Sequence, residues 1–121
     1  MVDDLDKFTI GYIACALWSS TDGNQEPLDN NYNIEDIAPN TLQGMVEDCA
    51  DFQAKNAELL AAISGYGHRE QAGHDFWLTR NRHGAGFWDR GLDAIGELLT
   101  KSSHAYGTVD LYVGDDGKIY S

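Results

Sequence analysis

The stretch AGHDFWLTRNRHGAGFWDRG, residues 72–91, decides which fold the sequence predicts. When it is aligned as two antiparallel strands with a turn within residues 81–84, three complementary pairs face each other: Trp77 with Trp88, Asp75 with Arg90, and Leu78 with Phe87. Each such cross-strand pair stabilises a sheet by roughly 0.2–1 kcal/mol. A shift of one residue would break all three pairs together. The pattern therefore predicts a β-hairpin. In this hairpin the many aromatic and charged side chains of the stretch stabilise the fold and do not form a catalytic site.

The C-terminal segment VDLYVGDDGKIYS, residues 109–121, predicts a second hairpin. Its short runs LYV and KIY are rich in residues that favour strands, and they flank Gly-Asp-Asp-Gly. The Asp116-Gly117 dipeptide within that tetrapeptide is a strong signal for a tight turn.

Three helices account for most of the remaining chain. Apolar residues recur at helical spacing in residues 5–18, and again in residues 91–106, where Gly107 ends the helix. Between them, an amphipathic helix begins at a cap on Asn40 or Thr41 and ends at Gly65. A short turn at residues 34–38, capped by Asn33, precedes it.

These elements predict one α+β domain spanning residues 1–121, with about three helices packed on a small antiparallel sheet made of two β-hairpins. The longest apolar run, residues 10–18, is too short to cross a bilayer. The acidic residues Asp3, Asp4 and Asp6 precede it, where a secretory signal would carry positive charge. We therefore expect a soluble protein inside the cell.

The charge balance is the strongest global feature of the sequence. Twenty acidic residues face eight basic ones, giving a net charge of −12, and residues 1–58 alone carry −10. Such a surface repels nucleic acid and anionic membranes. It attracts a basic surface on another protein and speeds the encounter with it. The alternative explanation is that the negative charge only keeps the protein soluble.

The predicted partner-binding surface is an acidic helical face together with the loop before it. The helix between Asn40 and Gly65 has a polar side that is crowded with carboxylates. The residues predicted to bind the partner are Glu47, Asp48, Asp51 and Glu58 on this helix, with Asp29, Glu35 and Asp36 in the preceding loop.

The alternative site is a catalytic or ligand-binding centre in residues 72–91. It would use the imidazole, carboxylate and guanidinium groups of His74, Asp75, His83, Asp89 and Arg90. No His pair has the four-residue spacing of helical metal ligands, and no C-x-x-C motif is present. Loop 22–36 alternates oxygen-bearing side chains but lacks the glycine and the bidentate glutamate of a calcium-binding EF-hand. The sequence therefore predicts no metal and no cofactor.

Neither cysteine is a candidate catalytic nucleophile. Cys15 and Cys49 each lie on the apolar side of a predicted helix, so we expect both to be buried free thiols. A nucleophilic cysteine needs a histidine beside it and an acid that orients the histidine, whereas Cys49 lies on the buried stripe of its helix.

Several of these segments also carry a family resemblance. GYIACALWSSTD, PLDNNYNIEDIAPNTL, AGHDFWLTRNRHGAGFWDRGL and YGTVDLYVGDDGKIY resemble a family of small acidic proteins of tailed bacteriophages. The resemblance implies a viral origin and a place in the host bacterial cytoplasm, and it implies no catalytic residues. Small acidic phage proteins of other families block host enzymes, as anti-CRISPR proteins and DNA mimics do. By this analogy we expect a non-enzymatic inhibitor of a host nucleic-acid-binding or defence protein, with a virion accessory as a further possibility.

Overall fold

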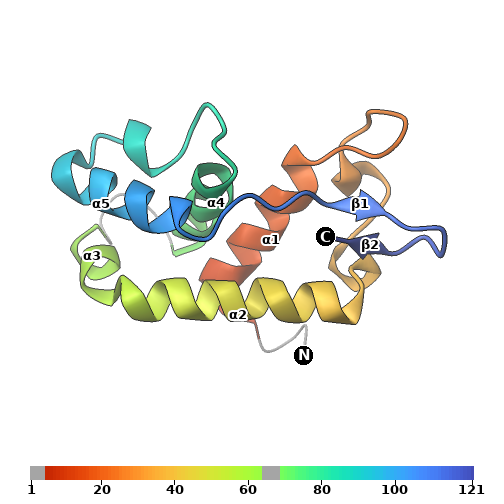
Figure 1. Cartoon of the computed structure of the whole chain (residues 1–121), viewed down its shortest axis with the longest axis horizontal. Helices are drawn as coiled ribbons and strands as arrows, with labels where there is room; N and C mark the ends of the chain where they lie inside the picture. Colours follow the sequence, from red (N-terminus) through yellow and green to blue (C-terminus); the bar gives the residue numbers. More distant parts are fainter. Residues whose placement is uncertain (1–4, 64–68) are drawn as a thin grey trace.

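The computed structural model describes residues 5–63 and 69–121, and its described part is mainly helical (Figure 1). Its helices are α1 (Lys7–Ser19), α2 (Pro39–Lys55), α3 (Ala57–Ala62), α4 (Arg69–Arg80) and α5 (Asp93–His104). Strands β1 (Tyr112–Val113) and β2 (Ile119–Tyr120) form a two-stranded sheet. The predicted α+β fold, with about three helices on a sheet of two hairpins, is therefore wrong.

The hairpin predicted for residues 72–91 is a helix followed by a loop. Its first half lies in α4, and its second half contains the 3₁₀ turn η5 (Phe87–Asp89). Trp77 is 1% exposed whereas Trp88 is 53% exposed, so the two indoles lie in different environments and do not pair across strands.

The reason for this error is that α4 is buried on nearly every side. Six consecutive residues, 75–80, are all buried in the structure. A helix buried all round shows no 3.6-residue apolar period, and a short apolar run does not distinguish a buried helix from a strand. The complementary residues that match across a hairpin in this segment therefore did not determine its conformation.

Helix α1 lies at the centre of the fold, as its almost continuous apolar sequence predicts. Asp6 caps its N-terminus, with Oδ1 accepting a hydrogen bond of 2.8 Å from the Thr9 amide. Phe8, Tyr12 and Cys15 are among its buried residues. The helix predicted for residues 5–18 is confirmed.

Two glycines set the close approach of α1 and α4. A Cβ built at Gly11 would overlap the carbonyl oxygen of Glu70, and one built at Gly73 would overlap that of Phe8. The two helix backbones are therefore in direct contact at this crossing. No other residue type leaves room for that contact.

Helix α2 begins earlier and ends earlier than the sequence predicts. Pro39 is its first residue rather than the end of the preceding turn, and Ala38 is the N-cap in place of Asn40 or Thr41. The helix breaks at Asn56, whose side chain donates to the Phe52 carbonyl oxygen at 2.9 Å. Helix α3 follows this break, and Gly65, the predicted end, lies outside the described residues.

The last helix and the C-terminal hairpin are confirmed. Helix α5 falls within the predicted residues 91–106, and Gly107 follows it with a φ of +73°. In the hairpin, Tyr112 pairs with Tyr120, and Gly117 occupies the turn with a φ of +78°.

An aromatic cluster fills the space between the helices. Phe52 from α2 stacks on Phe76 from α4, with ring centroids 4.1 Å apart, and Phe8 and Phe87 adjoin Phe52. These contacts join segments far apart in the chain around one core. None of the helices in residues 5–63 and 69–121 combines the length and apolar composition that a membrane crossing requires.

Candidate functional site

The helical acidic face lies on α2 and α3, but half of it serves the protein's own packing. Its four carboxylates are Glu47, Asp48, Asp51 and Glu58. Asp48 Oδ2 accepts a hydrogen bond of 2.8 Å from Arg80 Nη1. Asp51 Oδ2 accepts from the Tyr106 hydroxyl at 2.5 Å and lies 3.1 Å from Lys55 Nζ. The Tyr106 hydrogen bond and then Lys55 hold the pKa of Asp51 below its usual value.

The other predicted acidic residues lie on two 3₁₀ turns, η2 (Leu28–Asn30) and η3 (Ile34–Asp36). Asp29 and Glu35 are exposed. Asp36 Oδ2 instead accepts from the Asn33 amide at 2.8 Å, while Asn33 Oδ1 accepts from the Glu35 amide at 2.9 Å. This capping box confirms the predicted turn, and it leaves Asp29 and Glu35 as the exposed carboxylates of these turns.

The fold brings a second acidic segment beside these turns. Ile37 forms an isolated parallel bridge with Ile119, and the Ala38 amide donates to the Ile119 carbonyl oxygen at 2.8 Å. The C-terminal hairpin therefore lies against the segment before α2, at one end of the molecule (Figure 1). We call residues 20–38 and 110–121 together the acidic end. They contain eight acidic residues and one lysine, a net charge of −7.

The oxygen-rich loop within the acidic end uses several oxygens in its own turns. Asp22 Oδ1 accepts hydrogen bonds from the amides of Asn24 and Glu26. Asn31 also donates to the Glu26 carboxylate at 3.0 Å. Across residues 5–63 and 69–121, no group of three or more His, Cys, Asp or Glu side chains is placed to hold a metal ion.

The structure gathers part of the alternative site into one pocket, which we call the histidine pocket. It has a volume of about 580 Å³ and lies where the end of α1 meets α4 and the loop after α4. Its lining residues are Trp18, Ser19, His74, Leu78, His83, Gly84, Ala85 and Arg90. The Trp18 and His74 rings lie 6.1 Å apart at its edge. An aromatic face beside imidazole and guanidinium groups suits a small ligand with both a planar and an anionic part.

The two carboxylates of the alternative site have structural partners instead. Asp75 is fully buried, and its Oδ1 accepts from Arg90 Nη2 at 2.8 Å and from Gln71 at 3.0 Å. The predicted Asp75–Arg90 ion pair therefore forms, but between α4 and the segment after η5. Asp89 Oδ1 accepts from the Gly86 amide at 3.0 Å and so closes the 3₁₀ turn.

Both cysteines are free and buried, as the sequence predicts. Burial raises the pKa of the Cys15 thiol to about 12, and burial also raises that of Cys49. Both thiols therefore stay protonated near neutral pH, and a protonated thiol is a poor nucleophile.

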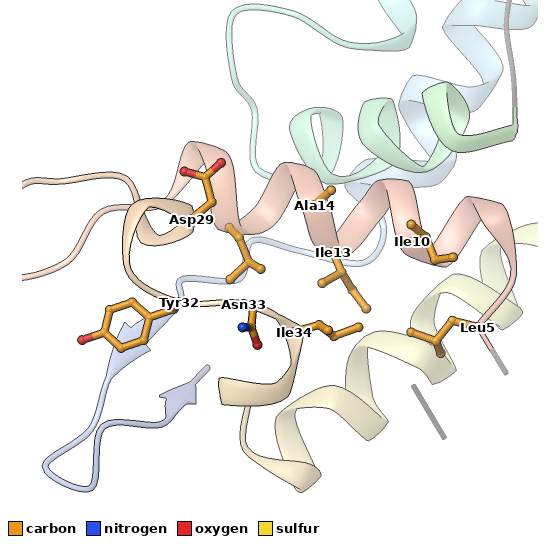
Figure 2. A pocket seen from close by; sticks show the side chains of 9 residues that line it. Leu5, Ile10, Ile13, Ala14, Asp29, Tyr32, Asn33 and Ile34 are labelled. Carbon is orange, nitrogen blue, oxygen red and sulfur yellow. The ribbon is translucent and has the colours of Figure 1, made fainter. Parts of the chain in front are cut away.

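An apolar groove lies between α1 and the segment that contains η2 and η3 (Figure 2). It has a volume of about 460 Å³. Its lining residues, which define the apolar groove, are Leu5, Ile10, Ile13, Ala14, Leu17, Asp29, Tyr32, Asn33 and Ile34. Six of the nine are aliphatic, and Asp29 belongs to the acidic end. The groove is therefore an apolar depression that borders an anionic surface.

An exposed apolar stripe on α1 continues from this groove. Ile10 is 43% exposed, Trp18 is 59% exposed, and Ala14 between them is also exposed. The four-residue spacing places all three on one side of the helix. The sequence pattern does not reveal this stripe, because it predicts α1 as a mostly buried helix. The available signal was that apolar residues occur on every side of α1.

Comparison of the chain with protein-family models, with curated proteins and with solved structures gives no match. The bacteriophage resemblance therefore stays a prediction.

Proposed function

We propose that this is a non-enzymatic binding protein that uses its acidic end to occupy a basic surface of another protein. The observation that carries the proposal is the meeting of two acidic segments, one on each side of the Ile37–Ile119 bridge. Their carboxylates lie more than 70 residues apart in the chain and carry a net charge of −7 at one end of the molecule. Concentrated charge of one sign steers an oppositely charged partner and orients it.

The partner that fits this surface is a protein with a basic, nucleic-acid-binding face. Such faces are built from clustered Lys and Arg that contact phosphates. An acidic protein that covers them would compete with nucleic acid and act as a stoichiometric inhibitor. The bacteriophage resemblance supports a host defence or nucleic-acid-binding protein as the target.

The test is capture of a partner from nuclease-treated bacterial lysate, with three matched pairs of neutral substitutions. Glu35→Gln with Asp115→Asn alters the acidic end, Glu47→Gln with Glu58→Gln alters the helical face, and Glu70→Gln with Glu97→Gln is the control. We expect the first pair to slow association roughly threefold to tenfold at about 0.05 M NaCl. The second pair should have a smaller effect, and the control pair none.

Two further measurements test whether the captured protein binds through a basic surface. Captured protein should elute at about 0.5 M NaCl, and double-stranded DNA should displace it, because both weaken contacts to a basic surface. Binding that ignores salt, or equal losses from all three pairs, would contradict the proposal.

The histidine pocket supports a second candidate function, binding of a small ligand. The specific observation is that His74, His83 and Arg90 line one pocket with the exposed ring of Trp18. Titration with small aromatic acids, followed by heteronuclear NMR, should shift signals around this pocket. His74→Ala with His83→Ala should abolish those shifts and leave the melting temperature unchanged. Shifts elsewhere, or none at millimolar ligand, would exclude this function.

A further inference from the structure

The apolar groove and the α1 stripe form one continuous apolar surface on the described chain. Ile10 and Ala14 belong to both, and Trp18 extends the stripe past the end of the groove. The stripe spans eight residues of helix, or about 12 Å. Single exposed apolar residues are ordinary, but an aligned set beside a concave site marks an interaction surface.

The size and shape of this surface suit the side chains of a helix. A second helix placed along α1 presents apolar residues at positions i, i+3 or i+4, and i+7 on one face. Over about 12 Å, such a helix makes roughly two turns. The groove beside the stripe, about 460 Å³ in volume, offers space for its largest apolar side chains (Figure 2).

The charge of the surrounding chain determines what kind of helix fits. Residues 5–38 build both walls of the groove, and they carry six acidic residues and one lysine, a net charge of −5. A helix with Lys or Arg beside its apolar face would lie next to Asp29, which lines the groove, and near the exposed Glu35 of η3. A second copy of this chain would bring another −12, and an anionic membrane would likewise be repelled.

We infer that the apolar groove and the α1 stripe bind the apolar face of a basic amphipathic helix on the partner protein. This inference rests on the proposed function and adds a hydrophobic anchor to it. Charge steers the partner to the acidic end, and burial of apolar side chains in the groove holds it there. The occupant is recognised by two features together: an apolar helical face and flanking cationic side chains.

The experiment measures binding of a fluorescent peptide of about 18 residues made only of Leu and Lys, roughly five helical turns. Its Leu residues follow the helical period. A control peptide has the same composition in an order that removes the apolar face. Fluorescence anisotropy at low salt should show that the amphipathic peptide binds at least tenfold more tightly than the shuffled one. The probe contains no Trp, so in a Trp88→Phe background a blue shift in emission reports burial of Trp18.

Matched protein variants separate the groove from general electrostatics. Ile10→Glu adds a negative charge and removes an apolar contact. Leu98→Glu adds the same charge at another exposed apolar position, on α5, where the side chain is 52% exposed. We expect Ile10→Glu to weaken binding of the amphipathic peptide about tenfold or more, because one aliphatic side chain is no longer buried against it. Leu98→Glu should leave binding unchanged or strengthen it slightly, and both variants should keep the wild-type circular dichroism spectrum.

The outcomes distinguish the two proposals. Equal binding of both peptides, or tighter binding by Ile10→Glu, overturns the groove inference and leaves the electrostatic function standing. Failure of both peptides to bind at low salt overturns the groove inference and contradicts the attraction of cationic segments on which the proposed function depends.

Discussion

At the scale of single residues, Arg80 shows how a charged side chain can hold the core together. Its side chain is 3% exposed. It donates to Asp48 at 2.8 Å, to the Tyr12 hydroxyl at 3.0 Å, and to the carbonyl oxygens of Tyr106 and Gly107 at 2.8 and 2.9 Å. One guanidinium therefore links α4 to α1, to α2 and to the chain after α5. The planar, multiply donating shape of Arg makes this possible, and Lys could not replace it.

The Arg80→Met variant should lose about 3–5 kcal/mol of unfolding free energy, because its partners would remain in place without a donor. Urea unfolding followed by circular dichroism measures this loss. Arg82→Met is the matched control, since Arg82 is exposed, and its stability should stay within about 0.5 kcal/mol of wild type. Similar losses for the two variants would show that the Arg80 contacts contribute little.

At the scale of secondary-structure elements, the crossing of α1 and α4 organises the fold. Gly11 and Gly73 bring the two backbones into contact, so side chains from both helices reach the same aromatic cluster. Tyr12 from α1 packs against Phe76 and Trp77 from α4, with ring centroids 5.3 Å apart in each case. The position of α1 at this crossing also decides which of its faces remains exposed as the stripe.

Replacing Gly73 by Ala should destabilise the protein by about 1–3 kcal/mol, although Ala favours a helix more than Gly does. The added methyl group would overlap the Phe8 carbonyl and push the helices apart. Gly44→Ala, in α2, is the control, because a Cβ there meets nothing within 4 Å. It should stabilise the protein by about 0.5–1 kcal/mol. Chemical denaturation of both variants checks the opposite signs, and stabilisation by Gly73→Ala would mean that the crossing is looser than described.

The elements that the sequence predicts correctly share a local signal. The turn at Asn33 is held by a capping box, α5 is followed by Gly107 with positive φ, and the C-terminal hairpin turns at Asp116-Gly117. Each of these signals acts between residues only a few positions apart. By contrast, α4 depends on contacts with distant segments, and its local pattern allowed both helix and strand.

At the scale of the whole molecule, charge is spread unevenly. The acidic end carries −7 of the total −12, and its two segments approach each other only in the folded state. Folding therefore brings like charges together, and their repulsion opposes folding.

We expect added salt to raise the melting temperature, because screening weakens this repulsion more than it weakens the buried ion pairs. Between about 0.02 M and about 0.5 M NaCl the rise should be roughly 3–6 °C, corresponding to about 1 kcal/mol. Differential scanning calorimetry measures it. The variant Glu35→Gln with Asp115→Asn should show a smaller rise than Glu70→Gln with Glu97→Gln. A melting temperature that falls with salt would contradict this account.

The candidate site was only partly predictable from the sequence, because it also depends on contacts between distant segments. The sequence identifies the carboxylates but not their neighbours, so it did not predict that Asp48, Asp51 and Asp36 accept hydrogen bonds from groups of the chain itself. The groove was not predicted, because its walls come from α1 and from the turns η2 and η3, and their relative placement is tertiary.

The sequence by itself determined the helices α1, α2 and α5 in outline, the C-terminal hairpin, the buried thiols and the excess of negative charge. Caps, turn residues and one-sided apolar patterns act over a few residues, so they can be recognised without knowing the fold. Only the tertiary structure decided that α4 is a helix, that the hairpin joins the acidic turns, and that an apolar groove borders them. These features depend on burial and contacts between segments far apart in the chain, and no local pattern encodes them.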